Sequence, residues 1–196
     1  MVAHRMKAYA QSSSWIRRMF EEGTRLKAIH GPDRVYDFSL GNPDVPPPPQ
    51  VLEAMAAHAR GMSHGYMANA GYPEVRAQVA AHASKMYGVD LAAEDIIMTC
   101  GAGGGLNVVL KAILDPGDEV VAIAPYFVEY GFYAENHGGR LVAVACDETF
   151  LPDAERIRKA LTARTKALII NSPNNPSGRV YPRGILENLA HVLADH

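Results

Sequence analysis

The sequence has 196 residues, 48% of them hydrophobic, and a formal net charge of −2 at pH 7. This length and apolar content suit one domain, or one and a half, with a sizeable core, so disorder is not the default expectation. Charges of the two signs are nearly balanced and form no long run, so nothing indicates binding to nucleic acid or to an anionic membrane surface. Because no apolar run is long enough to cross a bilayer and no signal-peptide block is present, we expect a soluble cytoplasmic protein with no membrane contact.

The cysteines and histidines form no pattern that indicates a disulfide or a metal. The two cysteines, Cys100 and Cys146, lack Cys-x-x-Cys spacing, which is typical of reduced thiols in a cytosolic protein. The eight histidines are scattered without the paired spacing of metal ligands. We therefore predict no metal site and assign the histidines to surface or capping positions.

The first part of the chain is predicted to be helical, with extended connections. Serines at 12–14 can cap a helix, Pro73 suits a first helical position, and Gly88 suits a helix end. The predicted elements are a helix from 12–14 to His30, a short strand over 35–40, a proline-rich turn at 46–49, and helices over 52–61 and 73–88.

From residue 95 onward, short apolar runs alternate with helical patterns, which is the signature of a parallel sheet with right-handed crossovers. The last helix reaches His196 without a cap or a breaker, so we expect an α/β fold whose sheet is incomplete in this chain. The predicted strands are 96–99, 120–124, 141–145 and 166–170, and the predicted helices are 106–114, 128–136, 154–161 and one that begins at Pro182.

The stretch 171–178 reads Asn-Ser-Pro-Asn-Asn-Pro-Ser-Gly and follows the apolar run 167–170. Pro173 and Pro176 fix φ on either side of Asn175, so its side chain is presented in one geometry. Ligands of open α/β sheets bind beyond the carboxyl ends of the strands, where an Asn offers an acceptor and donors to a polar ring substituent or a carboxylate. The alternative is a Pro/Asn loop that only ends a strand.

A glycine-rich loop at 100–105 is predicted to lie between a strand and a helix, where free backbone N–H groups and the helix dipole converge on an anion. A phosphate can sit at Ala102 to Gly104. No Gly-Lys-Ser/Thr follows, and the third small residue of a dinucleotide fingerprint is replaced by Leu106 or Val108, so both nucleotide loops are disfavoured. The alternative is a turn that allows close packing of helix on strand.

An aromatic residue follows the next predicted strand, which ends at Ala124 and continues as Pro125-Tyr126-Phe127. Such a ring can pack in the core, or it can stack on a planar ligand and orient it. A phosphate cradle, an aromatic face and an Asn at three strand ends of one sheet together describe a phosphorylated aromatic cofactor. Pyridoxal phosphate fits that description.

These motifs together resemble the class I and II aminotransferases, the aspartate aminotransferase-like branch of the fold-type I pyridoxal phosphate enzymes. The resemblance implies the three-layer, mostly parallel sheet of the large domain, partial here over 61–196, and an N-terminal arm with a segment of the small domain over 1–60. The motifs that carry it are 39–44, Tyr66 with 71–76, the glycine loop, 115–120, 125–127 and, most specific of all, 171–178.

The resemblance also implies roles for single positions. Backbone of the glycine loop holds the phosphate of pyridoxal 5′-phosphate, Phe127 stacks on the pyridine ring, and Asn175 bonds the ring hydroxyl and the substrate carboxylate. The Gly41 backbone lies against that carboxylate, and Tyr66 reaches the phosphate of the neighbouring subunit, which implies a homodimer. The implied cofactor-binding residues are Ala102, Gly103, Gly104, Phe127, Asn175 and Tyr66, and the implied substrate-binding residues are Gly41 and Asn175.

Two departures from the family pattern matter. Gly103 stands where the family often has Ser or Thr, so the phosphate loses a hydrogen bond worth about 1.5 to 3 kcal/mol if nothing replaces it. The Schiff-base lysine and the acid for the pyridine nitrogen are expected beyond His196. The lysines present lie in other contexts, at Lys7, Lys27, Lys85, Lys111, Lys159 and Lys166.

We therefore expect the N-terminal portion of an enzyme that transfers an amino group between an amino acid and a 2-oxo acid, with no turnover by this chain alone. One alternative is a fragment of a pyridoxal phosphate-dependent carbon–sulfur lyase, because such enzymes resemble the same motifs. A product assay of a full-length protein separates these reactions. The other alternative is a noncatalytic truncated fragment or dimerisation module, whose unfinished sheet is expected to promote aggregation.

Overall fold

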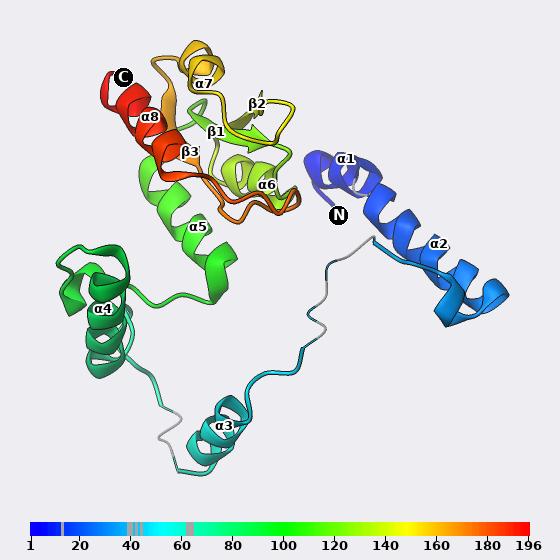
Figure 1. The fold of residues 1–196 in the computed structure, drawn as a ribbon, viewed down its shortest axis with the longest axis horizontal. Coiled ribbons are helices and arrows are strands. Elements are labelled where there is room, and N and C mark those ends of the chain that lie inside the picture. Colours follow the sequence, from blue (N-terminus) through cyan, green and yellow to red (C-terminus); the bar gives the residue numbers. More distant parts are fainter. Residues whose placement is uncertain (13, 39–40, 42, 44, 62–64) are drawn as a thin grey trace. The chain divides into compact units, whose positions relative to one another are not determined.

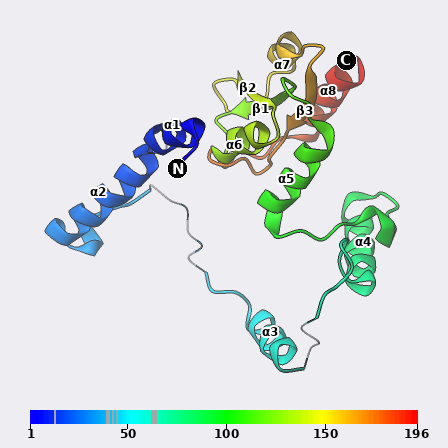
Figure 2. The same ribbon diagram turned by 180° about the vertical axis from the view of Figure 1, so that it is seen from behind.

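The computed structural model describes residues 1–12, 14–38, 41, 43, 45–61 and 65–196, and the chain forms two compact units, Met1–Gly65 and Tyr66–His196 (Figures 1 and 2). The assignment of residues 1–60 and 61–196 to an arm with a small-domain segment and to a large domain stays a prediction. Within the described residues, no helix has both the length and the apolar character needed to cross a membrane.

The first unit is helical, with helices α1 (His4–Ser12), α2 (Ser14–His30) and α3 (Pro49–Gly61) and the 3₁₀ turn η1 (Pro32–Arg34). The predicted helix that ends at His30 is confirmed. The strand predicted over 35–40 is wrong for 35–38, which pairs with no described strand, and residues 39–40 lie outside the described residues. This segment is instead tied to α2, where Lys27 Nζ lies 2.9 Å from Asp37 Oδ2.

The second unit begins with α4 (Pro73–Tyr87) and the 3₁₀ turn η2 (Ala93–Asp95), followed by α5 (Gly101–Ile113). Pro73 occupies the first turn of α4, and Gly88 ends the helix in the left-handed conformation with φ 68°. Both boundaries were predicted from these residues. The rest of the unit alternates strands and helices: β1 (Glu119–Ala124), α6 (Glu129–Asn136), β2 (Arg140–Ala145), α7 (Ala154–Ala160), β3 (Thr165–Ile169) and α8 (Arg183–Ala194).

The sheet has three parallel strands in the order β2-β1-β3, so the chain crosses from one edge strand to the other over central β1. One face packs on α5 and α6 through a core that contains Leu110, Val120 and Ala134. The other face packs on α7 and α8 through a core that contains Ile157 and Leu189 (Figure 1). The predicted three-layer α/β fold, with a parallel sheet between two layers of helices, is therefore confirmed. The three observed strands agree with those predicted over 120–124, 141–145 and 166–170 to within one residue at each end.

The strand predicted over 96–99 is wrong. Residues 96–99 are irregular, and their recorded backbone N–H bonds run to turns and not to a strand: Ile96 N donates to Ala93 O at 3.2 Å and Met98 N to Ala70 O at 2.9 Å. A strand needs a neighbour, and among the described residues none of β1, β2 and β3 pairs with this segment. The loop predicted over 100–105 is also wrong, because these glycines lie inside a helix: α5 begins at Gly101 and includes the following glycines in its first turns.

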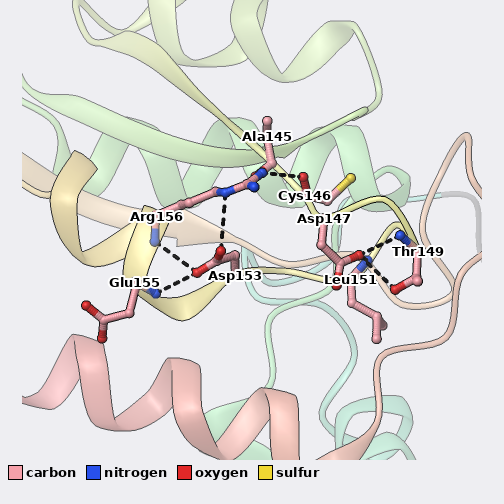
Figure 3. Close-up of polar contacts among 8 residues, drawn as sticks. All are labelled: Ala145, Cys146, Asp147, Thr149, Leu151, Asp153, Glu155 and Arg156. Atoms are coloured by element: carbon pink, nitrogen blue, oxygen red, sulfur yellow. Dashed lines mark hydrogen bonds and ion pairs between the residues drawn. The ribbon is translucent and has the colours of Figure 1, made fainter.

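The turn between β2 and α7 is closed by two aspartates (Figure 3). Asp147 Oδ1 accepts from Thr149 N at 2.8 Å and from Leu151 N at 2.9 Å. These bonds, the one from Leu151 foremost, lower the pKa of Asp147. Asp153 caps α7 by accepting from Glu155 N at 2.9 Å, so the polar side chains of this turn are used to hold the turn itself.

Candidate cofactor site

The carboxyl ends of the three strands lie at one edge of the sheet, where a parallel α/β sheet binds ligands. β1 ends at Ala124 and leads into Pro125-Tyr126-Phe127, and β3 ends at Ile169 and leads into the stretch 171–178. α5 ends just before the turn that enters β1, so its first turn lies toward the same edge of the sheet (Figure 1). The fold therefore gathers three of the predicted motifs on one side.

The first turn of α5 leaves backbone donors without partners. Within the described residues, no bond is recorded for the N–H groups of Ala102 and Gly103, whereas Gly104 is the first residue whose N–H points along the helix to Cys100 O, and no side chain caps the helix. Other helices differ: Asp153 accepts from the first turn of α7, and Pro182 O accepts from Ile185 N at 3.0 Å in α8. Unpaired N–H groups at a helix start, together with the helix dipole, form an anion site.

The glycines of α5 allow close approach of neighbouring side chains. A Cβ at position 103 would lie 2.9 Å from Tyr133 Oη, and a Cβ at position 105 would lie 3.3 Å from Thr99 Oγ1. The carbonyl of Gly103 is also held, because Asn107 Nδ2 donates to it at 2.9 Å. Side chains of other segments therefore pack against Gly103 and Gly105, while the N–H groups of Ala102 and Gly103 have no recorded partner among the described residues.

An aromatic cluster follows β1. The rings of Phe127 and Tyr130 meet edge to face with centroids 5.7 Å apart, and Tyr126 stacks on Tyr130 at 6.4 Å. Tyr130 is buried, and burial raises the pKa of its hydroxyl. Phe127 is half-buried, so one part of its ring is fixed by Tyr130 and the other part remains available to a ligand.

The loop that follows β3 is held by its own polar groups. Asn174 is 6% exposed, and its Oδ1 accepts from Ser177 Oγ at 2.8 Å. Ser172 Oγ accepts from Tyr181 N at 2.9 Å. Asn175 is exposed, and its backbone N–H donates to Asn171 Oδ1 at 2.7 Å. The buried Asn174 fixes the loop, and no bond is recorded for the Asn175 side chain within the described part of the chain.

The other two predicted site residues, Tyr66 and Gly41, belong to none of these elements. Tyr66 is fully exposed, at 108% of its reference area, at the start of the second unit. Gly41 is exposed and lies in the first unit. No group of His, Cys, Asp or Glu with the geometry of a metal site occurs among the residues that the structure describes. The roles of Tyr66 and Gly41 stay predictions.

The residues at this edge fit pyridoxal phosphate. The open N–H groups of α5 match a phosphate, and the half-exposed ring of Phe127 matches a planar ring. The side-chain amide of Asn175 has acceptor and donors for a ring hydroxyl. The lysine nearest in sequence to these motifs, Lys166, lies at the opposite edge of the sheet, with Nζ 4.0 Å from Asp118 Oδ2.

Sequence reasoning missed three residues beside the glycines. Tyr133 and His137 of the α6 region face Gly103 and Asn107 of α5, and His137 Nε2 lies 3.1 Å from Asn107 Oδ1. Tyr133 and His137 are four residues apart, as are Gly103 and Asn107, and residues with this spacing lie on one face of a helix. That matched spacing was the available signal, but it becomes informative only when the two helices are known to be neighbours.

A family model described as Aminotransferase class I and II matches residues 33–196. The aspartate/prephenate aminotransferase of Thermus thermophilus is 43% identical over 162 residues, which cover 81% of this chain and 42% of that protein. A solved amino transferase from Eubacterium rectale is 37% identical with a TM-score of 0.91, covering 100% of this chain and 51% of the other. The aspartate aminotransferase from Thermus thermophilus with maleate is 36% identical with a TM-score of 0.81, covering 92% and 47%.

The chain thus spans less than half the length of the curated relative described above. Its match to the family model extends over most of its own length, and the similar structures share its fold. The chain belongs to the class I and II aminotransferases, a family that depends on pyridoxal phosphate.

Proposed function

We propose that residues 66–196 supply the phosphate and ring contacts of a pyridoxal phosphate site in an aminotransferase. The observation that carries this proposal is that the N–H groups of Ala102 and Gly103 have no recorded partner among the described residues, in the first turn of α5, on the side of the sheet where Phe127 and Asn175 follow two strands. When bound, the cofactor supplies an electron sink for chemistry at the amino acid α-carbon. This chain's part is to hold the phosphate, to orient the ring and to place an amide beside its hydroxyl.

The reaction we propose for the whole protein is transfer of an amino group between an amino acid and a 2-oxo acid. The relatives described above are all named aminotransferases, which favours this reaction over elimination by a carbon–sulfur lyase. One relative is named for aspartate and prephenate and another was solved with maleate, which supports substrates with a second carboxylate. In this proposal Gly41 lies against the substrate carboxylate and Tyr66 completes the site of a partner subunit in a homodimer.

The Schiff-base lysine is proposed to lie outside this chain. Lys27 is paired with Asp37 in the first unit, and Lys166 lies at the strand starts near Asp118. Borohydride reduction of the chain with pyridoxal phosphate, followed by peptide mapping, tests this. We expect no single lysine to carry the label in stoichiometric yield, and one fully labelled lysine would contradict the proposal.

The phosphate contact is tested by Ala102→Asp, with Ala102→Asn as the matched neutral control. A carboxylate in the first turn of α5 suits the helix dipole and can occupy the open N–H groups, but it repels a phosphate. We expect Ala102→Asp to weaken binding of pyridoxal phosphate at least about tenfold while the melting temperature stays the same or rises. Fluorescence titration measures the dissociation constant, and equal constants for Asp and Asn would exclude a phosphate at α5.

A further inference from the structure

The outer side of the glycine turn is covered by a hydroxyl from another helix. A Cβ built on Gly103 would lie 2.9 Å from Tyr133 Oη, so the space of a side chain at position 103 is taken by that hydroxyl. Backbone geometry places the Gly103 nitrogen about 2.5 Å from the same Cβ position, so nitrogen and hydroxyl are at most about 5.4 Å apart. One anion oxygen that accepts at about 2.7 to 2.9 Å from each donor can bridge them.

The geometry points to Tyr133 as a ligand of the cofactor phosphate, which supplies from α6 the hydroxyl that Gly103 lacks. This inference rests on the proposed function, because it concerns the same phosphate. It assigns a role to the absence of a side chain at position 103: a larger residue there would displace the tyrosine hydroxyl from the open N–H groups.

The surroundings of Tyr133 suit a fixed donor. Its ring packs against the core under α5 and α6, and its hydroxyl donates to Glu129 one turn earlier in α6. That hydrogen bond, together with burial, raises the pKa of Tyr133, so the hydroxyl keeps its proton at neutral pH. Since a phenol has one proton to donate, Glu129 and a bound phosphate compete for it, and Glu129 is exposed enough to turn to water instead.

The Gly103 peptide is held in place from the same helix pair. Asn107 Nδ2 donates to Gly103 O at 2.9 Å, and His137 Nε2 lies 3.1 Å from Asn107 Oδ1. Tyr133 therefore lies beside Gly103, and His137 contacts Asn107 one helical turn later in α5. The Tyr133 hydroxyl thus faces a backbone that the Asn107 side chain holds in place. A ligand group supported in this way loses little side-chain freedom when it binds an anion.

The test compares Tyr133→Phe with the unaltered 196-residue chain, using pyridoxal phosphate and the phosphate-free analogue pyridoxal as probes in fluorescence titrations. Phenylalanine keeps the ring packing and removes only the hydroxyl. We expect the dissociation constant for pyridoxal phosphate to rise about tenfold and that for pyridoxal to stay unchanged. Tyr87→Phe, at an exposed tyrosine that ends α4, is the matched control and should change neither constant.

A second variant guards against a change in folding. Gly103→Ala should displace the hydroxyl and weaken pyridoxal phosphate binding to a similar extent, and the double variant with Tyr133→Phe should bind no more weakly than either single one. Equal binding of pyridoxal phosphate by the unaltered chain and Tyr133→Phe would overturn the role of Tyr133 alone. Absence of phosphate-dependent binding by the unaltered chain would overturn the proposed function, and this inference with it.

Discussion

The two ends of the three-stranded sheet, at the strand starts and at the strand ends, differ in how their polar groups are bonded. At the strand starts, the carboxylate of Glu119 is 3% exposed and is surrounded by Arg140, Thr162 and Thr165. Toward the strand ends, the N–H groups of Ala102 and Gly103 in the first turn of α5 have no recorded partner among the described residues, and the Asn175 side chain is exposed. The polar groups at the strand starts bond to one another, whereas at the strand ends bonded groups such as Asn174 and Asp147 lie beside groups that have no recorded partner among the described residues. Stability and binding are therefore expected to respond to different substitutions.

The largest effect on stability is expected from Glu119→Ala. Its carboxylate accepts from Thr162 Oγ1 at 2.8 Å and pairs with Arg140, so its loss leaves several polar groups of the strand starts without an acceptor. We expect the melting temperature to fall by roughly 10 °C, measured by circular dichroism. Binding of pyridoxal phosphate by the folded fraction should not change, and a matching loss of affinity would contradict the separation of the two edges.

Acid should act through the same residue. The hydrogen bond from Thr162, followed by the contacts with Arg140, lowers the pKa of Glu119 in the folded state. A lowered pKa contributes stability that is complete above the unfolded value of about 4.3 and is lost as the pH falls from there through the folded pKa. Glu119→Gln should therefore flatten the decline of stability below about pH 4.3, and a decline as steep as that of the unaltered chain would exclude Glu119 as its source.

A smaller loss of stability is expected from Asn174→Ala, which tests the fixed part of the binding edge. Its side chain accepts from Ser177 Oγ at 2.8 Å and from Ser177 N at 3.3 Å while only 6% exposed. Removing this acceptor should lower the free energy of unfolding by about 1 to 3 kcal/mol, measured by urea denaturation. Ser177→Ala is the partner control, and similar losses from both single variants and the double variant would show that one interaction is responsible.

Much of the fold could be predicted because its signals are local. The three strands are short apolar runs between turns, and α4 is bounded by Pro73 and Gly88, which act on φ directly. The strand over 96–99 could not be excluded from its sequence, because pairing depends on which neighbours are present. The start of α5 was missed because glycine has a low helix propensity, whereas four of the first five residues of α5 are glycines.

The candidate site was predicted less completely than the fold. Motifs placed Phe127 and Asn175 after two strands whose carboxyl ends share an edge, whereas Ala102 and Gly103 lie in the first turn of α5 and not after a strand, and the roles of all four stay predictions. Tyr133 could not be found in this way, since a tyrosine on an amphipathic helix is typical of core packing and only the contact across two helices reveals its hydroxyl.

The smallest effect on stability is expected from Asn175→Ala, the residue next to Asn174. The two asparagines are identical in sequence terms, but Asn174 is buried and bonded whereas Asn175 is exposed. Replacing Asn175 should change the free energy of unfolding by no more than about 0.5 kcal/mol, as for an ordinary surface position. Its amide is proposed to bond the cofactor ring, so affinity for pyridoxal phosphate should still fall about tenfold in a fluorescence titration. If the free energy of unfolding fell as far as in Asn174→Ala while the affinity for pyridoxal phosphate stayed the same, Asn175 would stabilise the loop and would not contact the cofactor ring.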